Sequence, residues 1–304
     1  MFKRLTCFSI VFFLAFSLPR VPLRAFEPSP EDRELLNKVE KDTLQYFIRS
    51  SDKKTGFTKD SSRPGSPSSV AATGFALAAY AIGDSRGWLA PDDAHDRILT
   101  TLQALRHKAA HQKGFFYHFL DAKTGNRVWG SEASSIDTAL AIAGALLAAR
   151  YYPGTEVEKL AHEIYERVDW KWMMNNSDFI CMGWTPESKF LPYYWDSYNE
   201  LMILVALAIG SPTSPVPPEA WERWLRPEGN YNDHKVIYAS TGSLFTYQFS
   251  HAYIDFRNLE DRGINYFENS REATLANREY AMSFSGQTRG YAASSWGLSA
   301  SVGP

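Results

Sequence analysis

Two kinds of helical segment alternate along the chain, and this alternation restricts the possible folds more than any other feature. Segments that are apolar or small on every side are residues 68–82, 134–152 and 197–209. Segments with one apolar stripe and charges elsewhere are residues 31–51, 92–109, 156–168, 218–226 and 264–282. A helix that is apolar all round must be buried, and its amphipathic neighbours must cover it. The order predicts inner helices that alternate with outer helices.

This alternation favours an all-α fold, an α/α toroid in which an outer ring of helices wraps an inner ring. A generic layered helical protein is the alternative that the pattern leaves open. An aromatic helix is predicted at residues 243–256, which makes nine helices in all. The one β signal is a small hairpin over residues 115–129 that turns at residues 123–126.

The long connections all lead into the inner helices. They are residues 52–67, 110–133, 169–196 and 227–242. Long loops in a compact domain are usually functional, and in a toroid these would share one rim. They hold many of the aromatic residues, including Tyr117, Trp184, Tyr194 and Trp195. We expect the functional site at this rim.

Charge and composition narrow the function classes. The chain has 32 Lys and Arg against 34 Asp and Glu, a formal net charge of −2. This balance argues against nucleic acid or an anionic membrane as partner, because both need a basic face. The 9 Trp, 16 Tyr and 19 Phe suit a sugar-binding site, although core packing explains them equally well.

Residues 1–25 have the form of a secretory signal peptide, because Lys3 and Arg4 precede an apolar run too short to span a membrane. Its removal would leave residues 26–304 as a single domain with Cys181 as the lone cysteine. An exported chain without an internal disulfide is expected in the bacterial periplasm or secreted. We expect a monomer with no membrane contact after signal removal.

Carboxylates among aromatics are the main candidates for chemistry, since the sequence has no nucleotide-binding or metal-binding motif. Asp196 and Glu200 lie four residues apart at the start of an inner helix, directly after three aromatic residues. One carboxylic acid that protonates a leaving oxygen, with a second carboxylate that activates water, is the requirement of glycosidic cleavage. A capping box from Ser197 to Glu200 is the structural alternative.

Asp137 is the second candidate. It enters the buried segment 134–152 and is followed by twelve residues without charge, so its carboxyl needs a partner or a ligand. A helix cap formed with Ser134 is the alternative. Third, His251 and Asp255 form an i, i+4 pair, and Asp255 or Arg257 alternatively closes an internal salt bridge. We expect no metal at these residues.

Several stretches together resemble a known family, the glucoamylase-like domain family. They are AATGFALAAYAIG (71–83), GFFYHFLD (114–121), SSIDTALAIAGAL (134–146), YYWDSYNE (193–200) and QFSHAYIDFR (248–257). This family includes the bacterial endo-β-1,2-glucanases of glycoside hydrolase family 144. The resemblance runs from about residue 39 to the end of the chain and implies an (α/α)6 barrel.

The resemblance also implies an inverting cleavage of β-1,2-glucan with no metal or organic cofactor. Glu200 matches the proposed general acid, Asp137 matches an acidic residue of the sugar-binding site, and His251 and Asp255 fall in a motif that lines it. Asp196, Tyr117, Trp184, Tyr194, Trp195 and Trp296 are further expected to bind substrate.

An (α/α)6 barrel has twelve helices, whereas about nine are predicted here. We therefore expect a catalytic domain truncated at its C-terminus, with its general base beyond Pro304 and its activity in doubt; a natural short form is the alternative. The expected partner is a glucan polysaccharide or oligosaccharide. A related enzyme on another glucan, a transglycosylase and a non-catalytic glucan-binding protein remain open.

Overall fold

The structure is a computed structural model that describes residues 28–300. The chain divides into two compact units, Met1–Glu40 and Lys41–Pro304. The boundary falls inside helix α1 (Pro30–Ser50). The described part of the first unit is the start of this helix, where Oγ of Ser29 accepts a hydrogen bond from the Asp32 amide at 3.1 Å. The expected signal peptide and Cys7 lie outside the described residues.

The helices of the larger unit follow the predicted order. After the end of α1 come α2 (Val70–Ser85), α3 (Pro91–His107), α4 (Ser135–Tyr151), α5 (Glu156–Glu166), α6 (Trp170–Met174), α7 (Leu201–Ile209), α8 (Ala220–Arg223) and α9 (Tyr266–Ser283). The short helix α6 was not predicted. No helix among residues 28–300 is long and apolar enough to span a bilayer.

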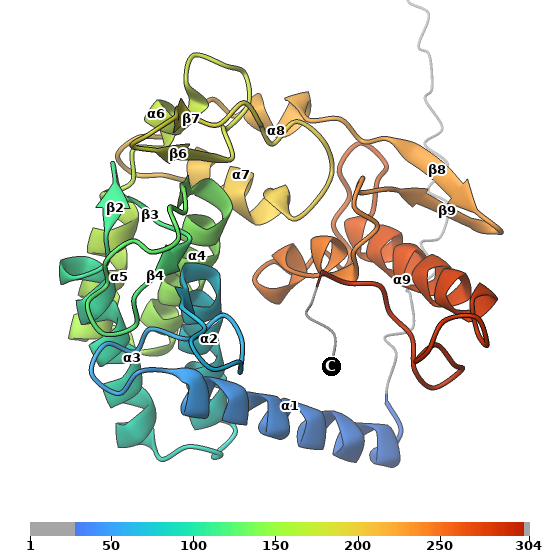
Figure 1. The fold of residues 1–304 in the computed structure, drawn as a ribbon, viewed down its shortest axis with the longest axis horizontal. Helices are drawn as coiled ribbons and strands as arrows, with labels where there is room; N and C mark the ends of the chain where they lie inside the picture. The colour runs from blue at the N-terminus through green and yellow to red at the C-terminus, as the bar shows by residue number, and fades with distance from the viewer. Residues whose placement is uncertain (1–27, 301–304) are drawn as a thin grey trace, which may run out of the picture. The chain divides into compact units, whose positions relative to one another are not determined.

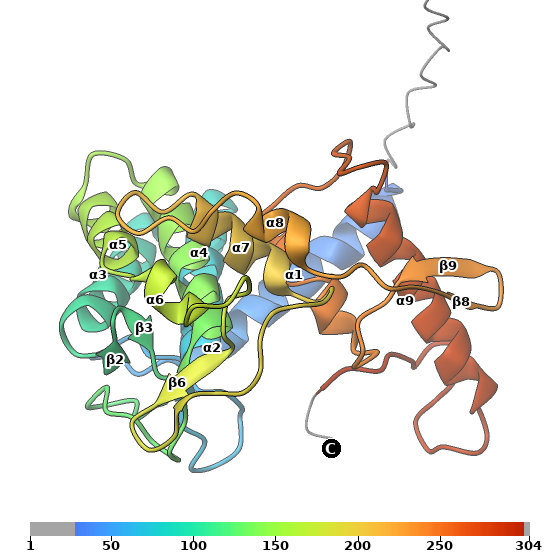
Figure 2. The ribbon, with the colours of Figure 1, turned by 90° about the horizontal axis from the view of Figure 1, so that it is seen from above.

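Helices α2 and α4 form the buried pair that the sequence predicts. Their backbones touch where Gly74 faces Gly144, because a Cβ atom on either glycine would collide with the backbone of the other helix. Helices α3 and α5 cover this pair from outside and contact each other (Figures 1 and 2). Each buries one stripe, with Ile98, Leu102 and Leu105 on α3 as an example. The prediction of inner and outer helices is confirmed for these four, and a closed toroid stays a prediction.

The aromatic helix predicted at residues 243–256 is wrong. Two separate 3₁₀ helices occupy the segment, η1 (Leu244–Tyr247) and η2 (Ser250–Ala252). Tertiary bonds compete with a regular helix here: the Tyr247 hydroxyl accepts from the amide of Ala239 at 2.8 Å, and the Ser250 hydroxyl is bonded to the start of α7. Bulky aromatic residues also have a weaker helix propensity than straight-chain ones.

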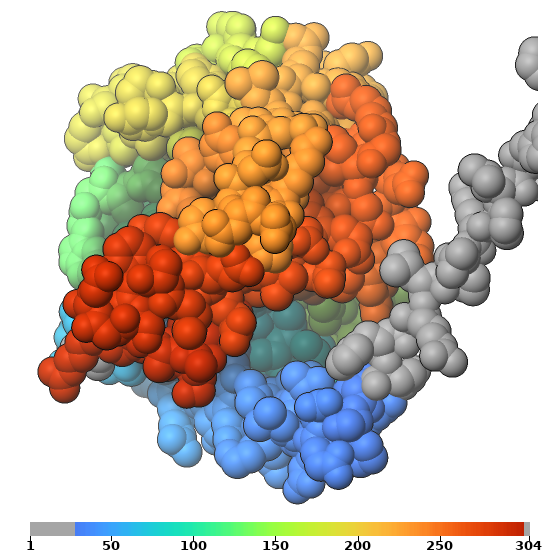
Figure 3. Space-filling view, turned by 90° about the vertical axis from the view of Figure 1, so that its right-hand side faces the viewer, coloured from blue at the N-terminus to red at the C-terminus, as the bar shows by residue number. Residues whose placement is uncertain are grey.

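The strands are short and lie in the long loops. Two-stranded antiparallel pairs join β1 (Ser68–Ser69) to β4 (Phe119–Leu120), β2 (His111–Gln112) to β3 (Phe115–Phe116), and β8 (Glu228–Tyr231) to β9 (His234–Ile237). A fourth set has three strands, β5 (Ala133–Ser134), β6 (Gly183–Thr185) and β7 (Lys189–Phe190), which form one antiparallel sheet. Figure 3 views the face on which α9 packs against the β8–β9 hairpin, in red and orange.

Only the part of the predicted hairpin next to its turn forms. Leu120 bridges Arg127 across the predicted turn, but the strand at Phe115–Phe116 pairs with β2 instead. The long loops are nevertheless tied to one another at the N-termini of the inner helices. Ser69, which precedes α2, pairs with Phe119, and Ala133, which precedes α4, pairs with Trp184. These short strand pairs, called the strand network below, position the candidate site.

Candidate functional site

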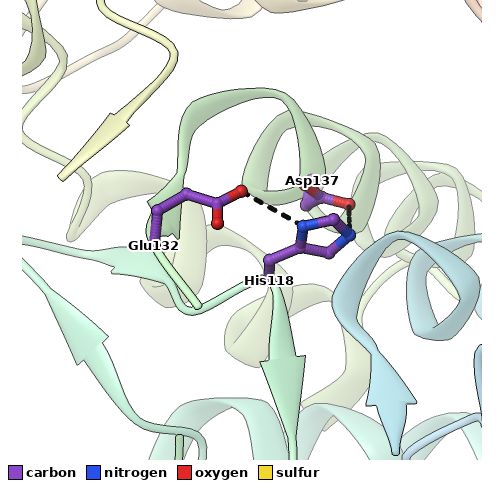
Figure 4. A group of neighbouring side chains, drawn as sticks. All are labelled: His118, Glu132 and Asp137. Carbon is purple, nitrogen blue, oxygen red and sulfur yellow. Dashed lines mark hydrogen bonds and ion pairs between the residues drawn. The ribbon is translucent and has the colours of Figure 1, made fainter. Parts of the chain in front are cut away.

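Three side chains meet at the start of α4, and they come from three different pieces of loop and helix (Figure 4). His118 follows β3, Glu132 precedes β5, and Asp137 lies in the first turn of α4. Nδ1 of His118 lies 3.1 Å from Oε1 of Glu132, and its Nε2 lies 3.5 Å from Oδ1 of Asp137. The imidazole ring is therefore placed between two carboxyl groups.

Backbone bonds hold this arrangement in place. The amide of His118 donates to the carbonyl of Glu132 at 2.8 Å, and the carbonyl of His118 accepts from the amide of Val70, the first residue of α2, at 3.1 Å. Both bonds belong to the strand network. They tie His118 to the starts of α2 and α4, and so fix the position of its ring.

Ser134 both caps helix α4 and binds the Asp137 side chain. Its Oγ accepts from the amide of Asp137 at 3.2 Å and donates to Oδ2 of the same residue at 2.5 Å. The capping interpretation is thus confirmed, and it does not exclude a role for the carboxyl. The side chain of Asp137 is only 10% exposed, so its carboxyl needs polar partners. Ser134 contacts one of its oxygens and His118 the other.

The electrostatics of the three groups are coupled. Burial raises the pKa of Asp137, and the His118 charge and the Ser134 bond oppose that rise. Burial lowers the pKa of His118, but the bond to Glu132 and the charge of Asp137 outweigh burial, so its pKa is raised overall. Burial favours a higher pKa for Glu132, but the hydrogen bond to His118 and the other attractive contacts outweigh burial, so its pKa is lowered overall. The charge of a protonated imidazole explains the lowered pKa of Glu132, whereas at Asp137 burial outweighs that charge.

The same residues could in principle offer ligands to a metal ion. One atom each from His118, Glu132 and Asp137 lie within 4.8 Å of one another. However, the two carboxyl groups face opposite nitrogens of the ring (Figure 4), and an imidazole binds a metal through one nitrogen. The arrangement in the structure is that of one imidazole ring in contact with a carboxyl group at each nitrogen.

Glu200 lies at the N-cap position of α7, and its side chain makes no capping hydrogen bond. The helix begins at Leu201 instead of Ser197, so the capping box considered from the sequence is not formed. Burial, with a smaller contribution from the charge of Asp137, raises the pKa of Glu200 to about 7. At pH 7 about half of this carboxyl is therefore protonated and able to act as a general acid, whereas an ordinary glutamic acid is almost fully ionised there.

The segment η2 is tied to the start of α7 beside Glu200. The hydroxyl of Ser250 donates to the Glu200 carbonyl at 2.9 Å and accepts from the amide of Ile203 at 3.1 Å. His251, the next residue, is half-buried and shares a 2.9 Å hydrogen bond with the Ser270 hydroxyl. Burial lowers the pKa of His251. Ser250, which the sequence analysis did not single out, holds the predicted motif against α7.

Asp255 and Asp196 are solvent-exposed. The Asp255 carboxylate makes two 2.8 Å bonds to the guanidinium of Arg257, so the salt bridge considered from the sequence is present. These bonds lower the pKa of Asp255 to about 2. The backbone carbonyl of Asp196 accepts from the amide of Leu225 at 2.7 Å. Neither carboxyl joins the Asp137 cluster, and their role in binding substrate stays a prediction.

The predicted aromatic residues differ in what their side chains contact. Trp195 is buried and donates its indole N–H to Ser135 at 2.8 Å, and Tyr117 is buried beneath the Arg127 guanidinium. Tyr194 is half-buried and accepts from Asn175 at 3.1 Å. Trp184 packs against Trp172 and Lys189, and Trp296 lies near Arg278. Sugar binding by these five stays a prediction.

Comparison with known proteins shows which proteins the chain is similar to. Residues 192–304 match a family model named Glycoamylase and described as "Putative glucoamylase". The resemblance predicted from the sequence is confirmed. An endo-β-1,2-glucanase from Chitinophaga pinensis, solved with sophorotriose and glucose, is 27% identical with a TM-score of 0.81; the match covers 89% of this chain and 72% of that one.

Two other solved structures have the same fold. A "putative glucoamylase" from Bacteroides uniformis is 23% identical with a TM-score of 0.83, and the match covers 91% of this chain and 73% of that one. A β-1,2-glucanase from Parabacteroides distasonis is 23% identical with a TM-score of 0.81, and the match covers 90% of this chain and 45% of that one. The comparison with curated proteins finds no match. The glucoamylase-like fold is thus common to these structures and this chain.

Proposed function

We propose that the protein is a glycoside hydrolase that cleaves β-1,2-glucan within the polymer, with inversion at the anomeric carbon and Glu200 as general acid. The helices would belong to an (α/α)6 toroid. The proposal is supported by the similarity to two solved β-1,2-glucanases, one of them 27% identical. It is supported independently by the carboxyl chemistry at the starts of α4 and α7.

The observation that carries the proposal is the raised pKa of Glu200. A carboxyl that donates a proton to a glycosidic oxygen must remain protonated near neutral pH, whereas an ordinary glutamic acid does not. Burial and the nearby charge of Asp137 supply the required shift, to about 7. Proton transfer to the leaving oxygen lets the C–O bond break as positive charge develops on the sugar ring.

Asp137 has two roles in this mechanism. Its charge favours the protonated form of Glu200. Its carboxylate would also accept a hydrogen bond from a sugar hydroxyl, since a carboxylate offers more acceptor positions than Ser134 and His118 occupy. The charge of protonated His118 favours the ionised form of Asp137 and so opposes the rise that burial causes in its pKa.

Inversion requires a second carboxylate that activates water on the opposite face of the sugar, about 6.5–9.5 Å from the acid. Water attacks the anomeric carbon, the base takes the proton of that water, and Glu200 gives its proton to the departing oxygen. The products are two shorter glucans, and the enzyme then exchanges one proton between its two carboxyl groups through solvent.

We further propose that the protein acts as a monomer after export to the periplasm or the medium, on an uncharged polysaccharide or oligosaccharide. The near-neutral formal charge of −2 suits such a substrate, because a charged surface does not attract an uncharged polymer.

A linkage panel tests the substrate. The purified protein is incubated with linear β-1,2-glucan, β-1,3-glucan, β-1,4-glucan and starch, and products are followed by chromatography and by NMR of the newly formed anomer. Cleavage of β-1,2-glucan alone, to mixed oligosaccharides with inverted anomers, supports the proposal. Cleavage of another polymer reassigns the substrate, transfer to acceptor sugars indicates a transglycosylase, and binding without cleavage indicates a non-catalytic protein.

A further inference from the structure

Trp129 is an exposed aromatic residue that the mechanism above does not use. It is 70% exposed, more than any other large hydrophobic residue among those that the structure describes. Its backbone φ of +57° lies in the left-handed region, which bulky side chains seldom occupy. An exposed indole held in an unfavourable backbone conformation contributes little to the core, so its position needs another explanation.

The turn that carries Trp129 is braced by a single side chain. The guanidinium of Arg127 donates to the carbonyls of Gly130 and Ser131, each at 2.5 Å. The amide of Ser131 also donates to the carbonyl of Val128 at 3.1 Å. Arg127 therefore encloses the turn, and the indole is held in position before any ligand arrives, which lowers the entropy cost of binding.

A chain of ring contacts connects Trp129 to the candidate site through Phe119. Its indole packs on Phe119 with ring centres 5.2 Å apart, and Phe119 stacks on the imidazole of His118 with ring centres 3.9 Å apart. His118 in turn contacts Asp137. One phenyl ring thus separates the exposed indole from the charged cluster.

The arginine that bonds the turn also binds a carboxylate. Arg127 makes two bonds to the carboxylate of Glu187, at 2.7 and 2.9 Å, and Glu187 remains 63% exposed. Glu187 is thus held on the same guanidinium that bonds the turn of Trp129. A flat apolar ring with a fixed, exposed carboxylate on the same turn-bracing side chain suits a pyranose, whose C–H face packs on a ring while its hydroxyls bond to carboxylates.

We infer that Trp129 is a sugar-stacking subsite next to the Asp137 cluster, which takes the apolar face of one glucosyl residue of a bound glucan while Glu187 accepts a hydroxyl hydrogen bond. The inference rests on the proposed function and extends it to a residue outside the proton-transfer chemistry. It predicts that Trp129 contributes to affinity for chains long enough to reach it and does not contribute to proton transfer.

The test uses Glu200→Gln as background, so that bound glucan is not cleaved, and linear β-1,2-glucan oligosaccharides as probe. Calorimetry compares this protein with versions that also carry Trp129→Ala, Trp129→Phe or Tyr151→Ala. Tyr151 is a matched control, because it is a 39% exposed aromatic at the opposite end of helix α4 from Asp137. Thermal melting checks that each variant is folded.

We expect Trp129→Ala to weaken binding about tenfold, while Trp129→Phe and Tyr151→Ala bind within about threefold of the background protein. A second measurement needs no variant at Trp129: hydroxyl-radical oxidation, read by mass spectrometry, should fall at Trp129 when glucan saturates the protein. Equal affinity with and without the indole, or unchanged oxidation of Trp129, overturns the subsite and leaves the proposed function standing. Absence of glucan binding by the background protein contradicts the proposed function and the subsite together.

Discussion

Nε2 of His118 lies 3.5 Å from Oδ1 of Asp137, and this contact places a positive charge beside a carboxyl that the fold has buried. The other ring nitrogen faces Glu132 at 3.1 Å. The pair gives a polar partner to a carboxyl group that lies one turn into an otherwise apolar helix. It also connects α4 electrostatically to Glu200 at the start of α7.

Removal of the Asp137 charge should lower the pKa of Glu200, because that charge favours the protonated form. For Asp137→Asn we expect the alkaline limb of kcat/KM on β-1,2-glucan to move to lower pH, with a loss of rate of about a hundredfold. His118→Gln should move the limb in the same direction, since Asp137 then holds a proton more readily. A limb that stays in place in both variants contradicts the coupling.

The wild-type pH profile should reflect Glu200 directly. A general acid works only while protonated, and the pKa of Glu200 is about 7. We therefore expect kcat/KM to fall as the pH rises through about 7, tenfold per unit beyond it. The check is initial rates on β-1,2-glucan across neutral pH in buffers of constant ionic strength. A rate that is level through neutrality and falls only in strong alkali would sink this assignment.

Folding stability should report the same group without any substrate. The pKa of Glu200 rises from its ordinary value of 4.5 to about 7 on folding, so the folded state holds the proton more tightly than the unfolded state. The free energy of unfolding from this group is then highest below pH 4.5 and declines as the pH rises through about 7. Glu200→Gln should remove this decline and stabilise the protein at pH 8 by about 3 kcal/mol relative to wild type. Urea unfolding of both proteins at acidic and alkaline pH measures the difference; equal pH dependence contradicts it.

The contact between α2 and α4 should not tolerate a methyl group. A Cβ on Gly74 would meet the backbone at Leu140 and Ala141, which cannot move aside as a flexible side chain could. We expect Gly74→Ala to lower the free energy of unfolding by about 1–3 kcal/mol. Gly210→Ala is the control, because its Cβ would meet its nearest atoms only at 3.3 Å and 3.4 Å. Similar losses in the two variants would argue against backbone contact between the helices.

The helices could be predicted because their signals are local. Segment 134–152 is apolar on every side, and α4 runs from Ser135 to Tyr151 as expected. The segment 243–256 was predicted wrongly, since its aromatic periodicity resembles a helix while Tyr247 bonds to the preceding loop at Ala239 and Ser250 bonds to the start of α7. Such bonds leave no periodic trace in the sequence.

The candidate site could be predicted only in part for the same reason. Asp137 and Glu200 stand out because an ionisable residue beside a long apolar run needs a partner. His118 and Glu132 do not, because strand pairs of two residues each bring them to Asp137. A histidine inside an aromatic stretch, followed by a glutamate before the next helix, is the one signal that could have indicated them.

The most direct test of the account is the rate of Glu200→Gln on linear β-1,2-glucan. Glutamine keeps the size of the side chain but cannot donate the proton, so we predict a loss of kcat of about a thousandfold or more with binding of the glucan retained. Turnover at the wild-type rate would remove Glu200 from the mechanism and contradict the central claim.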